Sequence, residues 1–206
     1  MSKQSSGKRS TPDHYTLRAK KEGYPARSVY KLEELNNKFN LFGHDDRILD
    51  IGAAPGSWSM YCLRKIGKNG FVAAIDLNDL TIDMSDKRLF FIRGDFFEEK
   101  NLSALLDKGL FNTVISDAAP STTGNRTVDA GRSFTLAAGI IDISGRMLAS
   151  GGNLAIKIFQ GGDEKELVGM LLNHFKTAKI LKPKACRKES FETYIVGLDF
   201  TPEDSL

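Results

Sequence analysis

The sequence predicts an α/β fold in which a doubly wound, mostly parallel β-sheet carries helices on both faces. Apolar segments of strand length alternate with segments of helical periodicity from about residue 47 to residue 200, and this alternation is typical of parallel βαβ units. A loop that contains Gly52 and Gly56 follows directly after the first of these strands. A composition of 41% hydrophobic and 27% charged residues fits one globular domain of 206 residues.

The individual elements are predicted from the period of the apolar residues. Strands are expected at residues 47–51, 71–76, 89–92, 113–117, 153–159 and 194–200. Helices are expected at residues 27–39, 58–66, 102–107, 132–149 and 164–175, and the fourth helix is expected to stop at Gly151-Gly152. Because no repeat and no long linker interrupts this series, we expect a single domain over residues 13–206, with residues 13–40 as an N-terminal helical extension.

The N-terminal segment carries most of the excess positive charge. The chain has 29 Lys and Arg against 26 Asp and Glu, but residues 1–31 hold eight of these cations and only two of the acids. Residues 1–12 show no periodicity and are predicted to be a disordered basic lead-in. Such a segment either binds a polyanion through counterion release or is a solvated tail, and the residues leave both interpretations open.

The cysteine, histidine and hydropathy patterns argue against several classes of protein. Cys62 and Cys186 are far apart and the three histidines are scattered, so we expect neither a disulfide framework nor a metal site. No segment approaches the roughly 18 apolar residues of a membrane helix, and the N-terminus lacks the apolar core of a signal peptide. We therefore expect no membrane association and a cytoplasmic location.

The loop after the first strand is predicted to bind a nucleotide-containing cofactor, because open parallel sheets bind ligands beyond the carboxyl ends of their strands. Glycines let the backbone approach a ligand, and the following helix offers its positive N-terminus. The NAD-type spacing G-x-G-x-x-G would need glycine where the chain has Ala54 and Ser57. The pattern acid-x-Gly-x-small-x-Gly, from Asp50 through Gly52 to Gly56, fits better, so an NAD-dependent oxidoreductase is the weaker interpretation.

Two acidic residues follow the next two strands and are candidates to contact the same ligand. Asp76 ends the second strand 20 residues after Gly56, where a carboxylate accepts hydrogen bonds from ribose hydroxyls. Asp95, beside Phe96, could accept a hydrogen bond from an adenine amino group. Either acid could instead be a solvated strand end, and Trp58, the one tryptophan, could belong to the core or pack beside the ligand.

The residues after the fourth strand and within the fifth indicate the kind of substrate. Asp117 is followed by Ala118 and Ala119, which cannot stack a base as the Pro-Pro-aromatic motif of enzymes that methylate exocyclic amines does. A hydroxyl acceptor must lose its proton as it attacks, and this calls for a general base. Lys157, between two isoleucines in a predicted buried strand, is a candidate for that base; the alternative is a strand-end lysine that snorkels to solvent.

In this order the motifs resemble the FtsJ/RlmE family of ribosomal RNA ribose 2′-O-methyltransferases, from about residue 13 to residue 200. Each motif alone is weak, whereas their ordered sum is specific. The motifs that carry the resemblance are Tyr15 with residues 19–27 (AKKEGYPAR), and residues 30–32 (YKL), 49–56 (LDIGAAPG), 75–77 (IDL), 94–96 (GDF), 116–120 (SDAAP), 156–161 (IKIFQG), 182–187 (KPKACR) and 192–194 (ETY).

The resemblance implies a Rossmann-like, S-adenosylmethionine-dependent methyltransferase fold with a seven-stranded sheet. The family's catalytic Lys-Asp-Lys-Glu tetrad falls on Lys31, Asp117, Lys157 and Glu192. Its cofactor contacts fall on Gly56, Trp58, Asp76, Asp95 and Asp117, to which the loop pattern adds Gly52. The chain departs from the family pattern at Ser57, Cys186 and Ala130. None of these three is a tetrad position, so they bear on substrate fit more than on activity.

The resemblance also implies RNA as the partner. The expected RNA-binding residues are Lys20, Lys21, Arg27, Lys182, Lys184 and Arg187, with Lys188 beside them, although cations in a turn are also common as a solvated surface. The implied substrate is a uridine of large-subunit (23S) ribosomal RNA, within the large ribosomal subunit, and the implied enzyme is a monomer. The alternatives are a ribose methyltransferase for transfer RNA or a messenger cap, and a catalytically inactive RNA-binding module.

These roles predict a direct transfer. Neutral Lys157 takes the proton of a ribose 2′-hydroxyl while the oxygen attacks the sulfonium methyl in line, with no covalent enzyme intermediate. Asp117 orients Lys157 and the cofactor, Lys31 steers the target phosphate or ribose, and Glu192 positions the hydroxyl or Lys31. Alignment is expected to supply most of the rate gain, on the order of 7 to 11 kcal/mol.

Overall fold

The computed structural model describes residues 13–161, 164–187 and 189–202. Its helices are α1 (His14–Glu22), α2 (Val29–Phe39), α3 (Ser57–Lys65), α4 (Glu99–Leu106), α5 (Arg126–Ser144) and α6 (Glu164–Leu172). Its strands are β1 (Arg47–Ile51), β2 (Phe71–Asp76), β3 (Leu89–Arg93), β4 (Phe111–Ser116), β5 (Leu148–Phe159), β6 (Phe175–Leu181) and β7 (Glu192–Phe200). The predicted lead-in, residues 1–12, and Lys188 lie outside the described residues.

The strands form a single sheet of seven in the order β3-β2-β1-β4-β5-β7-β6. Neighbouring strands from β3 to β5 pair in parallel, whereas β7 runs antiparallel to both β5 and β6. The strand order reverses between β1 and β4, and the carboxyl end of such a switch point is where open α/β sheets bind ligands. The predicted seven-stranded, mostly parallel sheet is confirmed.

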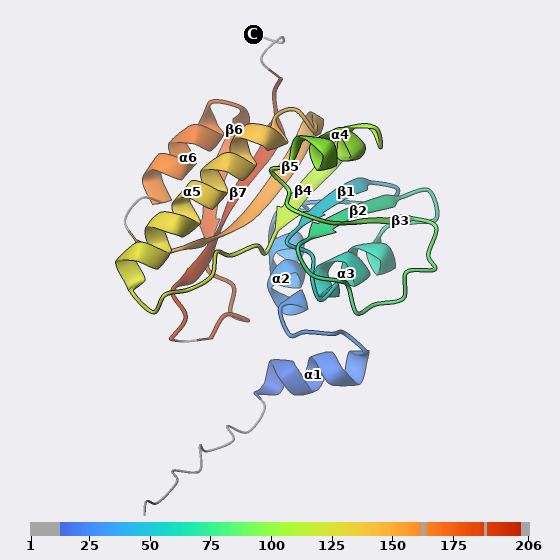
Figure 1. Ribbon diagram of the computed structural model, residues 1–206, viewed down its shortest axis with the longest axis horizontal. Helices are drawn as coiled ribbons and strands as arrows, with labels where there is room; N and C mark the ends of the chain where they lie inside the picture. The colour runs from blue at the N-terminus through green and yellow to red at the C-terminus, as the bar shows by residue number, and fades with distance from the viewer. Residues whose placement is uncertain (1–12, 162–163, 188, 203–206) are drawn as a thin grey trace, which may run out of the picture.

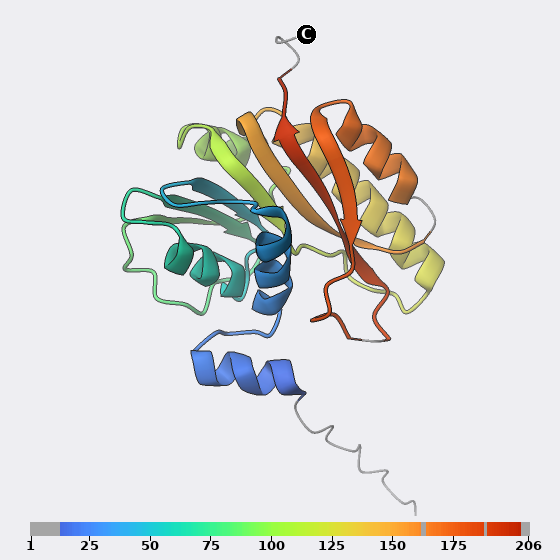
Figure 2. The ribbon, with the colours of Figure 1, turned by 180° about the vertical axis from the view of Figure 1, so that it is seen from behind.

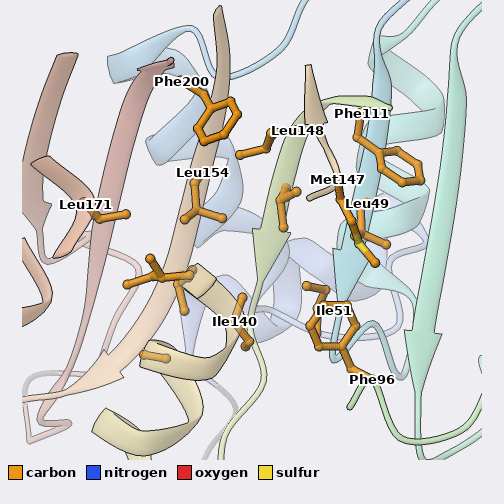
Figure 3. Packing of buried hydrophobic residues seen from close by; sticks show 14 of the residues in the cluster. Leu49, Ile51, Phe96, Phe111, Ile140, Met147, Leu148, Leu154, Leu171 and Phe200 are labelled. Atoms are coloured by element: carbon orange, nitrogen blue, oxygen red, sulfur yellow. The ribbon is translucent and has the colours of Figure 1, made fainter. Parts of the chain in front are cut away.

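Helices cover both faces of the sheet (Figures 1 and 2). α4, α5 and α6 lie on one face, and α2 and α3 lie on the other. Adjacent residues of a strand belong to different cores because successive side chains point to opposite faces of the sheet. Leu49 and Ile156 belong to the cluster under α5, whereas Ile48 and Ala155 belong to the cluster under α2. Figure 3 shows part of the first cluster, in which Leu49 lies beside Met147 and to which Ile140 of α5 also belongs.

The fourth predicted helix differs from the observed one at both ends. The structure has α5 at Arg126–Ser144, and β5 already begins at Leu148, so Gly151 and Gly152 lie inside a strand. The pairing of β5 with β4 shifts register between Phe111 and Thr113. The prediction that these glycines stop a helix is therefore wrong. They lie at an irregular stretch of a strand, which is a common position for glycine.

Strand β6 is the element that the apolar period did not predict. The predicted helix over residues 164–175 ends at Leu172, and the chain turns back to form β6 at one edge of the sheet. Lys176 and Lys179 are exposed on this strand. Lysines are common on edge strands because they discourage pairing with another chain, and they hide the alternation that marks a half-buried strand.

The N-terminal extension lies at the end of the sheet toward which β5 points. Asp13 caps α1 by accepting a hydrogen bond from the Thr16 N–H at 2.9 Å. α2 buries Tyr30, Leu32 and Leu35 against the sheet. In Figures 1 and 2, α1 and the loop between β6 and β7 lie at this same end. Segments from the two ends of the chain are thereby placed beside the carboxyl ends of the parallel strands.

Candidate active site

The carboxyl ends of β1, β2, β3 and β4 enclose a cavity of about 500 Å³. Gly52 lines it from the loop after β1, Asp76 from the end of β2, Asp95 from the loop after β3 and Asp117 from the loop after β4. These four strands are consecutive neighbours in the sheet, so their carboxyl ends meet at one opening. The structure thus brings together four of the residues that the sequence predicts to bind the cofactor.

The glycine loop is tied to the loops on either side of it. Gly52 has a φ of 76°, and a Cβ at this position would lie 2.6 Å from the Cβ of Ala118. Only glycine therefore allows the loop after β1 to pack against the loop after β4. On the other side, the N–H of Ala54 donates a hydrogen bond of 3.0 Å to the Asp76 carboxylate. These two contacts hold the backbone of the loop open toward the cavity.

Gly56 and Trp58 are not among the described residues that line this cavity. Gly56 precedes α3 with a φ of 108°, and a Cβ there would lie 2.9 Å from the Ile82 side chain. Trp58 is buried, its indole N–H donates to the Ser28 carbonyl at 2.9 Å, and its ring lies 5.9 Å from the Tyr194 ring. Both residues shape the loop from behind, and direct contact of either with the cofactor stays a prediction.

The charge of the cavity discriminates between the two cofactors that the loop allows. Asp76, Asp95 and Asp117 line it together with apolar Phe96 and Leu136, and no Lys or Arg is among the described residues of its wall. Three carboxylates disfavour the pyrophosphate of NAD and favour a cation. S-adenosylmethionine carries a sulfonium and an ammonium group against one carboxylate, so its net charge is positive. Carboxylates can also accept hydrogen bonds from its ribose hydroxyls and its adenine amine. The residues present fit S-adenosylmethionine.

Asp50 lies beneath this cavity as a buried acid. One carboxylate oxygen accepts a hydrogen bond of 2.6 Å from Ser59 of α3, and the other has no partner among the described residues. Burial, together with the negative charges of Asp117 and Asp76, raises the pKa of Asp50 to about 7 against the opposing effect of the Ser59 hydrogen bond. Asp50 therefore joins β1 to the first turn of α3 while carrying a proton over much of the acidic range.

The first half of the predicted tetrad is the Lys157–Asp117 pair. The Lys157 Nζ lies 3.1 Å from the Asp117 Oδ1 and also donates a hydrogen bond to the Asp117 carbonyl, and the two side chains are 11% and 18% exposed. Tyr194, which faces Lys157 across the β5–β7 pairing, donates its hydroxyl proton to the same Oδ1 at 2.7 Å. Burial raises the pKa of the Tyr194 phenol well above its ordinary value, so the phenol remains a donor.

Tyr194 belongs to the motif at residues 192–194, but the sequence alone predicts no role for it in this site. Its hydroxyl and the Lys157 amine hold the same Asp117 oxygen from two directions. The signal that identifies it is the antiparallel register of β5 and β7, in which residues 157 and 194 are opposite each other. That register depends on long-range pairing and is not visible in the local pattern of either strand.

The second half of the tetrad is the Lys31–Glu192 pair. The Lys31 Nζ of α2 lies 2.8 Å from the Glu192 Oε1 at the start of β7, with side-chain exposures of 11% and 15%. Burial alone would lower the pKa of Lys31, but the charges of Asp117 and Glu192 and the hydrogen bond to Glu192 outweigh it and raise that pKa. Lys31 is therefore a fixed cation, and the acids that act on it are Asp117 of the first pair and Glu192 of the second.

A second cavity, of about 470 Å³, opens beside the Lys31–Glu192 pair. The turn before α2 forms one wall, and the segment that leads into β7 forms the other. Arg27, Lys31 and Arg187 bring positive charge to its lining, together with the acids Glu189 and Glu192. The lining of this cavity therefore suits an anionic ligand better than that of the acidic cavity does.

The three departures from the family pattern occupy structural positions. The Ser57 Oγ accepts a hydrogen bond of 2.7 Å from the Ala26 N–H, which ties the N-terminal extension to α3. Burial raises the pKa of the Cys186 thiol to about 12, with Glu192 adding to the rise through its charge and a hydrogen bond. Ala130 is buried in α5. The neutral thiol can donate to Glu192 as a serine hydroxyl would.

The predicted RNA-binding cations differ in how far they are already engaged. Lys20, Lys21, Lys182, Lys184 and Arg187 are exposed, and the Arg187 Nε lies 4.0 Å from the Asp13 carboxylate. Arg27, by contrast, pairs with Asp13 and donates to the carbonyl of Ala185, so it links α1 to the loop before β7. Lys182 donates to the Ser190 carbonyl at 2.6 Å within that same loop. Arg27 and Lys182 thus shape the rim of the second cavity. Contact of any of these residues with RNA stays a prediction.

The described ranges of the chain contain neither a metal-binding cluster nor a helix suited to cross a membrane. No group of three or more His, Cys, Asp or Glu side chains there is placed to hold a metal ion. No helix in those ranges has the length and apolar character needed to cross a membrane.

Most of this chain is similar in sequence to known methyltransferases. The profile of the FtsJ-like methyltransferase family matches residues 24–200. The chain is 50% identical over 193 residues to the ribosomal RNA large subunit methyltransferase E of Treponema denticola, covering 94% of this chain and 97% of that protein. Proteins with the same name from Borreliella afzelii and Desulfosudis oleivorans are 47% and 41% identical, over 91% and 92% of this chain and 98% and 91% of those proteins.

Solved structures agree with the fold. A protein of Plasmodium falciparum described as a ribosomal RNA methyltransferase superposes with a TM-score of 0.76 at 27% identity, covering 87% of this chain and all of that chain. Human methyltransferase-like protein 13, solved with S-adenosylhomocysteine, superposes with a TM-score of 0.56 at 13% identity, over 86% of this chain and 82% of that chain, and shares the fold.

The fold and the acidic cavity define the class of the protein, a methyltransferase built on a Rossmann-like sheet. The chain belongs to the FtsJ-like methyltransferase family. The predictions of the family, of an enzyme of this class and of S-adenosylmethionine as its cofactor are confirmed.

Proposed function

We propose that this chain transfers the methyl group of S-adenosylmethionine to the ribose 2′-hydroxyl of a uridine in large-subunit (23S) ribosomal RNA. One observation carries the proposal: the Lys157–Asp117 pair lies at the acidic cavity, the Lys31–Glu192 pair lies at the second, cationic cavity, and the charge of Asp117 acts on Lys31. Asp117 lines the first cavity and pairs with Lys157, whereas Lys31 and Glu192 line the second. The names of the relatives, which refer to the large ribosomal subunit, support this choice of RNA.

The acidic cavity would hold the cofactor. When bound, S-adenosylmethionine supplies a methyl group that its sulfonium makes electrophilic. Asp76 would accept from the ribose hydroxyls and Asp95 from the adenine amine, while the Gly52 backbone lets the ligand approach the loop closely. Asp117 would face the sulfonium, since its carboxylate is anchored at one oxygen by both Tyr194 and Lys157.

Proton removal from the hydroxyl falls to Lys157. A lysine amine accepts a proton only in its neutral form, so Lys157 would first release the proton of the ion pair to solvent. Lys157 is the tetrad amine that touches a residue of the acidic cavity. Lys31 keeps its charge because nearby acids raise its pKa, and it would attract a phosphate or the developing alkoxide. Glu192 would hold Lys31 in place and accept a hydrogen bond from the ribose.

The finer proposals concern the substrate context. We infer that the RNA is part of the large ribosomal subunit, that the enzyme acts as a monomer in the cytoplasm, and that residues 13–206 form its single domain, with residues 13–40 on the RNA side. Support comes from the cations around the second cavity and from α1, which presents Lys20 and Lys21 to solvent. We further propose that residues 1–12 add affinity for RNA without sequence preference.

The direct experiment is methylation in vitro with a labelled methyl donor. Purified chain would be given free 23S RNA, assembled large subunits, transfer RNA and capped RNA, and the label would be mapped to a nucleotide and to a ribose position. We expect one labelled 2′-oxygen in 23S RNA, and no label when that nucleotide carries a 2′-deoxy ribose. Label on a base, or on transfer or capped RNA alone, would contradict the proposal.

A further inference from the structure

We propose that Phe191 is a stacking platform for a nucleobase of the RNA, within one nucleotide of the ribose that is methylated, with Phe159 and Arg126 supporting it. This inference rests on the proposed function for the acceptor and adds the element that grips a base. The three residues come from the loop before β7, the end of β5 and the first turn of α5.

The aromatic pair lies outside both cores. The rings of Phe159 and Phe191 are 4.6 Å apart between centroids, with an angle of 52° between their planes. Both side chains are partly exposed, and neither belongs to the two clusters of buried residues identified within the described part of the chain. The carbonyl of Phe191 accepts a hydrogen bond of 2.8 Å from the Gln160 N–H, which fixes the loop that carries the ring to the end of β5.

The platform adjoins the acceptor site. Phe191 lines the cationic cavity and directly precedes Glu192, whose carboxylate is 2.8 Å from the Lys31 amine. Phe159 is the register partner of Glu192 across β5 and β7, and it lies two residues after Lys157. A ribose held by the tetrad therefore places its own base or a neighbouring base within reach of the Phe191 ring.

A cation completes the platform. The Arg126 guanidinium lies 5.4 Å from the centroid of the Phe191 ring, and the Arg126 side chain is exposed. Arg126 also lines a further hollow of about 460 Å³ with Thr127, Gln160, Gly161 and Glu164, and Gln160 directly follows Phe159 in the chain. Guanidinium and aromatic planes both stack on bases, and a guanidinium also attracts phosphate. This combination of charge and ring surface suits RNA rather than an apolar partner.

Binding to RNA measures the stack directly. We expect Phe191→Ala to weaken RNA affinity roughly 5- to 150-fold, the range for loss of one base–aromatic stack, while affinity for S-adenosylmethionine stays unchanged. The salt dependence of binding should keep its slope, because a stacked ring neutralises no phosphate. Phe191→Leu is the matched variant: it keeps an apolar side chain without a ring face, and it should lose nearly as much affinity as the alanine variant.

Fluorescence gives a second readout that is independent of turnover. The chain has one tryptophan, Trp58, which is buried and supplies a constant background. Phe191→Trp should retain RNA affinity, and its added emission should be quenched when 23S RNA binds. Leu172→Trp is the control, because Leu172 is 53% exposed on α6, near the amino end of β6 and away from the tetrad; its emission should not respond.

The outcomes separate this inference from the proposed function. Wild-type RNA affinity in Phe191→Leu, or unquenched emission from Phe191→Trp at saturating RNA, would overturn the platform even while the wild-type chain methylates 23S RNA. If the wild-type chain binds 23S RNA without methylating it, the proposed function fails, and the fluorescence still reports whether Phe191 stacks on a base.

Discussion

The two cavities of this protein are built in different ways from different parts of the chain. The acidic cavity is formed by residues that directly follow four neighbouring strands, and its charges are Asp76, Asp95 and Asp117. The cationic cavity is formed by the turn before α2 and the segment before β7, which are about 160 residues apart in the chain. Its lining includes Arg27, Lys31 and Arg187.

This difference indicates a division of labour. Strand ends are held rigidly by the sheet and can present carboxylates in a fixed array, as a small cofactor needs. The acceptor side is assembled from segments added before β1 and after β6, so its charge and shape can vary while the cofactor cavity stays constant. The tetrad spans the boundary, with Asp117 in one wall and Lys31 and Glu192 in the other.

The largest expected effect is on catalysis, at Lys157 between the two cavities. Replacement Lys157→Ala should lower kcat about 10²- to 10⁴-fold, the usual contribution of a general base, while S-adenosylmethionine binding, measured by calorimetry, should stay within a few-fold. Lys176→Ala is the matched control, since Lys176 is exposed on the edge strand β6. Near-normal turnover of Lys157→Ala on 23S RNA would refute the general-base role.

The next effect is confined to the acidic cavity. Asp76→Ala should weaken S-adenosylmethionine binding roughly 10- to 100-fold, because it removes a charged acceptor worth about 1.5–3 kcal/mol per hydrogen bond. RNA affinity should not change. The Asp76 carboxylate also accepts a hydrogen bond from the Ala54 N–H at 3.0 Å. Asp76→Asn therefore serves as the control that retains an acceptor oxygen. Its affinity for S-adenosylmethionine should lie between those of the wild-type chain and Asp76→Ala. Equal calorimetric affinities for all three proteins would remove Asp76 from the cofactor site.

A third expected effect concerns stability under the acidic cavity. Because the pKa of Asp50 is raised to about 7, the folded chain keeps a proton that the unfolded chain releases above about pH 4. The stability that this group contributes is full below pH 4 and is lost as the pH rises toward 7, by about 1.4 kcal/mol per pH unit. Asp50→Asn does not titrate, so its free energy of unfolding should lack this slope.

Urea unfolding over that pH range measures the Asp50 effect. The control is Asp142→Asn, which changes an exposed carboxylate on α5 and should keep the wild-type slope. Parallel pH profiles for the wild-type chain and Asp50→Asn would show that Asp50 does not hold a proton in the folded state.

The smallest effect is expected at the rim of the cationic cavity. Arg187 is 67% exposed in its side chain, so Arg187→Ala should weaken RNA binding only a few-fold and lower the slope of log affinity against log salt by about 0.7 to 0.9. Arg146→Ala, an exposed arginine at the other end of the sheet, should change neither. An unchanged salt slope for Arg187→Ala would mean that Arg187 does not contact a phosphate.

The acidic cavity was largely predictable from the sequence because each part of it is local. A strand, the turn that follows it and an acid at the strand end are encoded within about ten residues, and parallel pairing then gathers such ends at one edge. Gly52, Asp76 and Asp95 could therefore be named in advance from the local pattern, and the family resemblance added Asp117. Only the tertiary structure showed that Trp58 is buried behind the loop, where its indole bonds to Ser28.

The edge strand β6 and the irregular first part of β5 were less predictable. Strand β6 carries exposed lysines that obscure its alternation, and Gly151 looks like a helix stop until the pairing of β4 with β5 is known. Both errors have one physical cause: the local period reports burial, whereas an edge strand and an irregular strand are defined by their neighbours.

By itself the sequence determined the alternation of strands and helices from β1 to β5, the class of cofactor and, through the family resemblance, the members of the tetrad. Only the tertiary structure decided how these members pair, Lys157 with Asp117 and Lys31 with Glu192. It alone decided that Tyr194 anchors Asp117. The physical reason is that hydrogen bonds and ion pairs require particular distances between atoms, and residues 31, 117, 157 and 194 acquire those distances only when the sheet and α2 pack together.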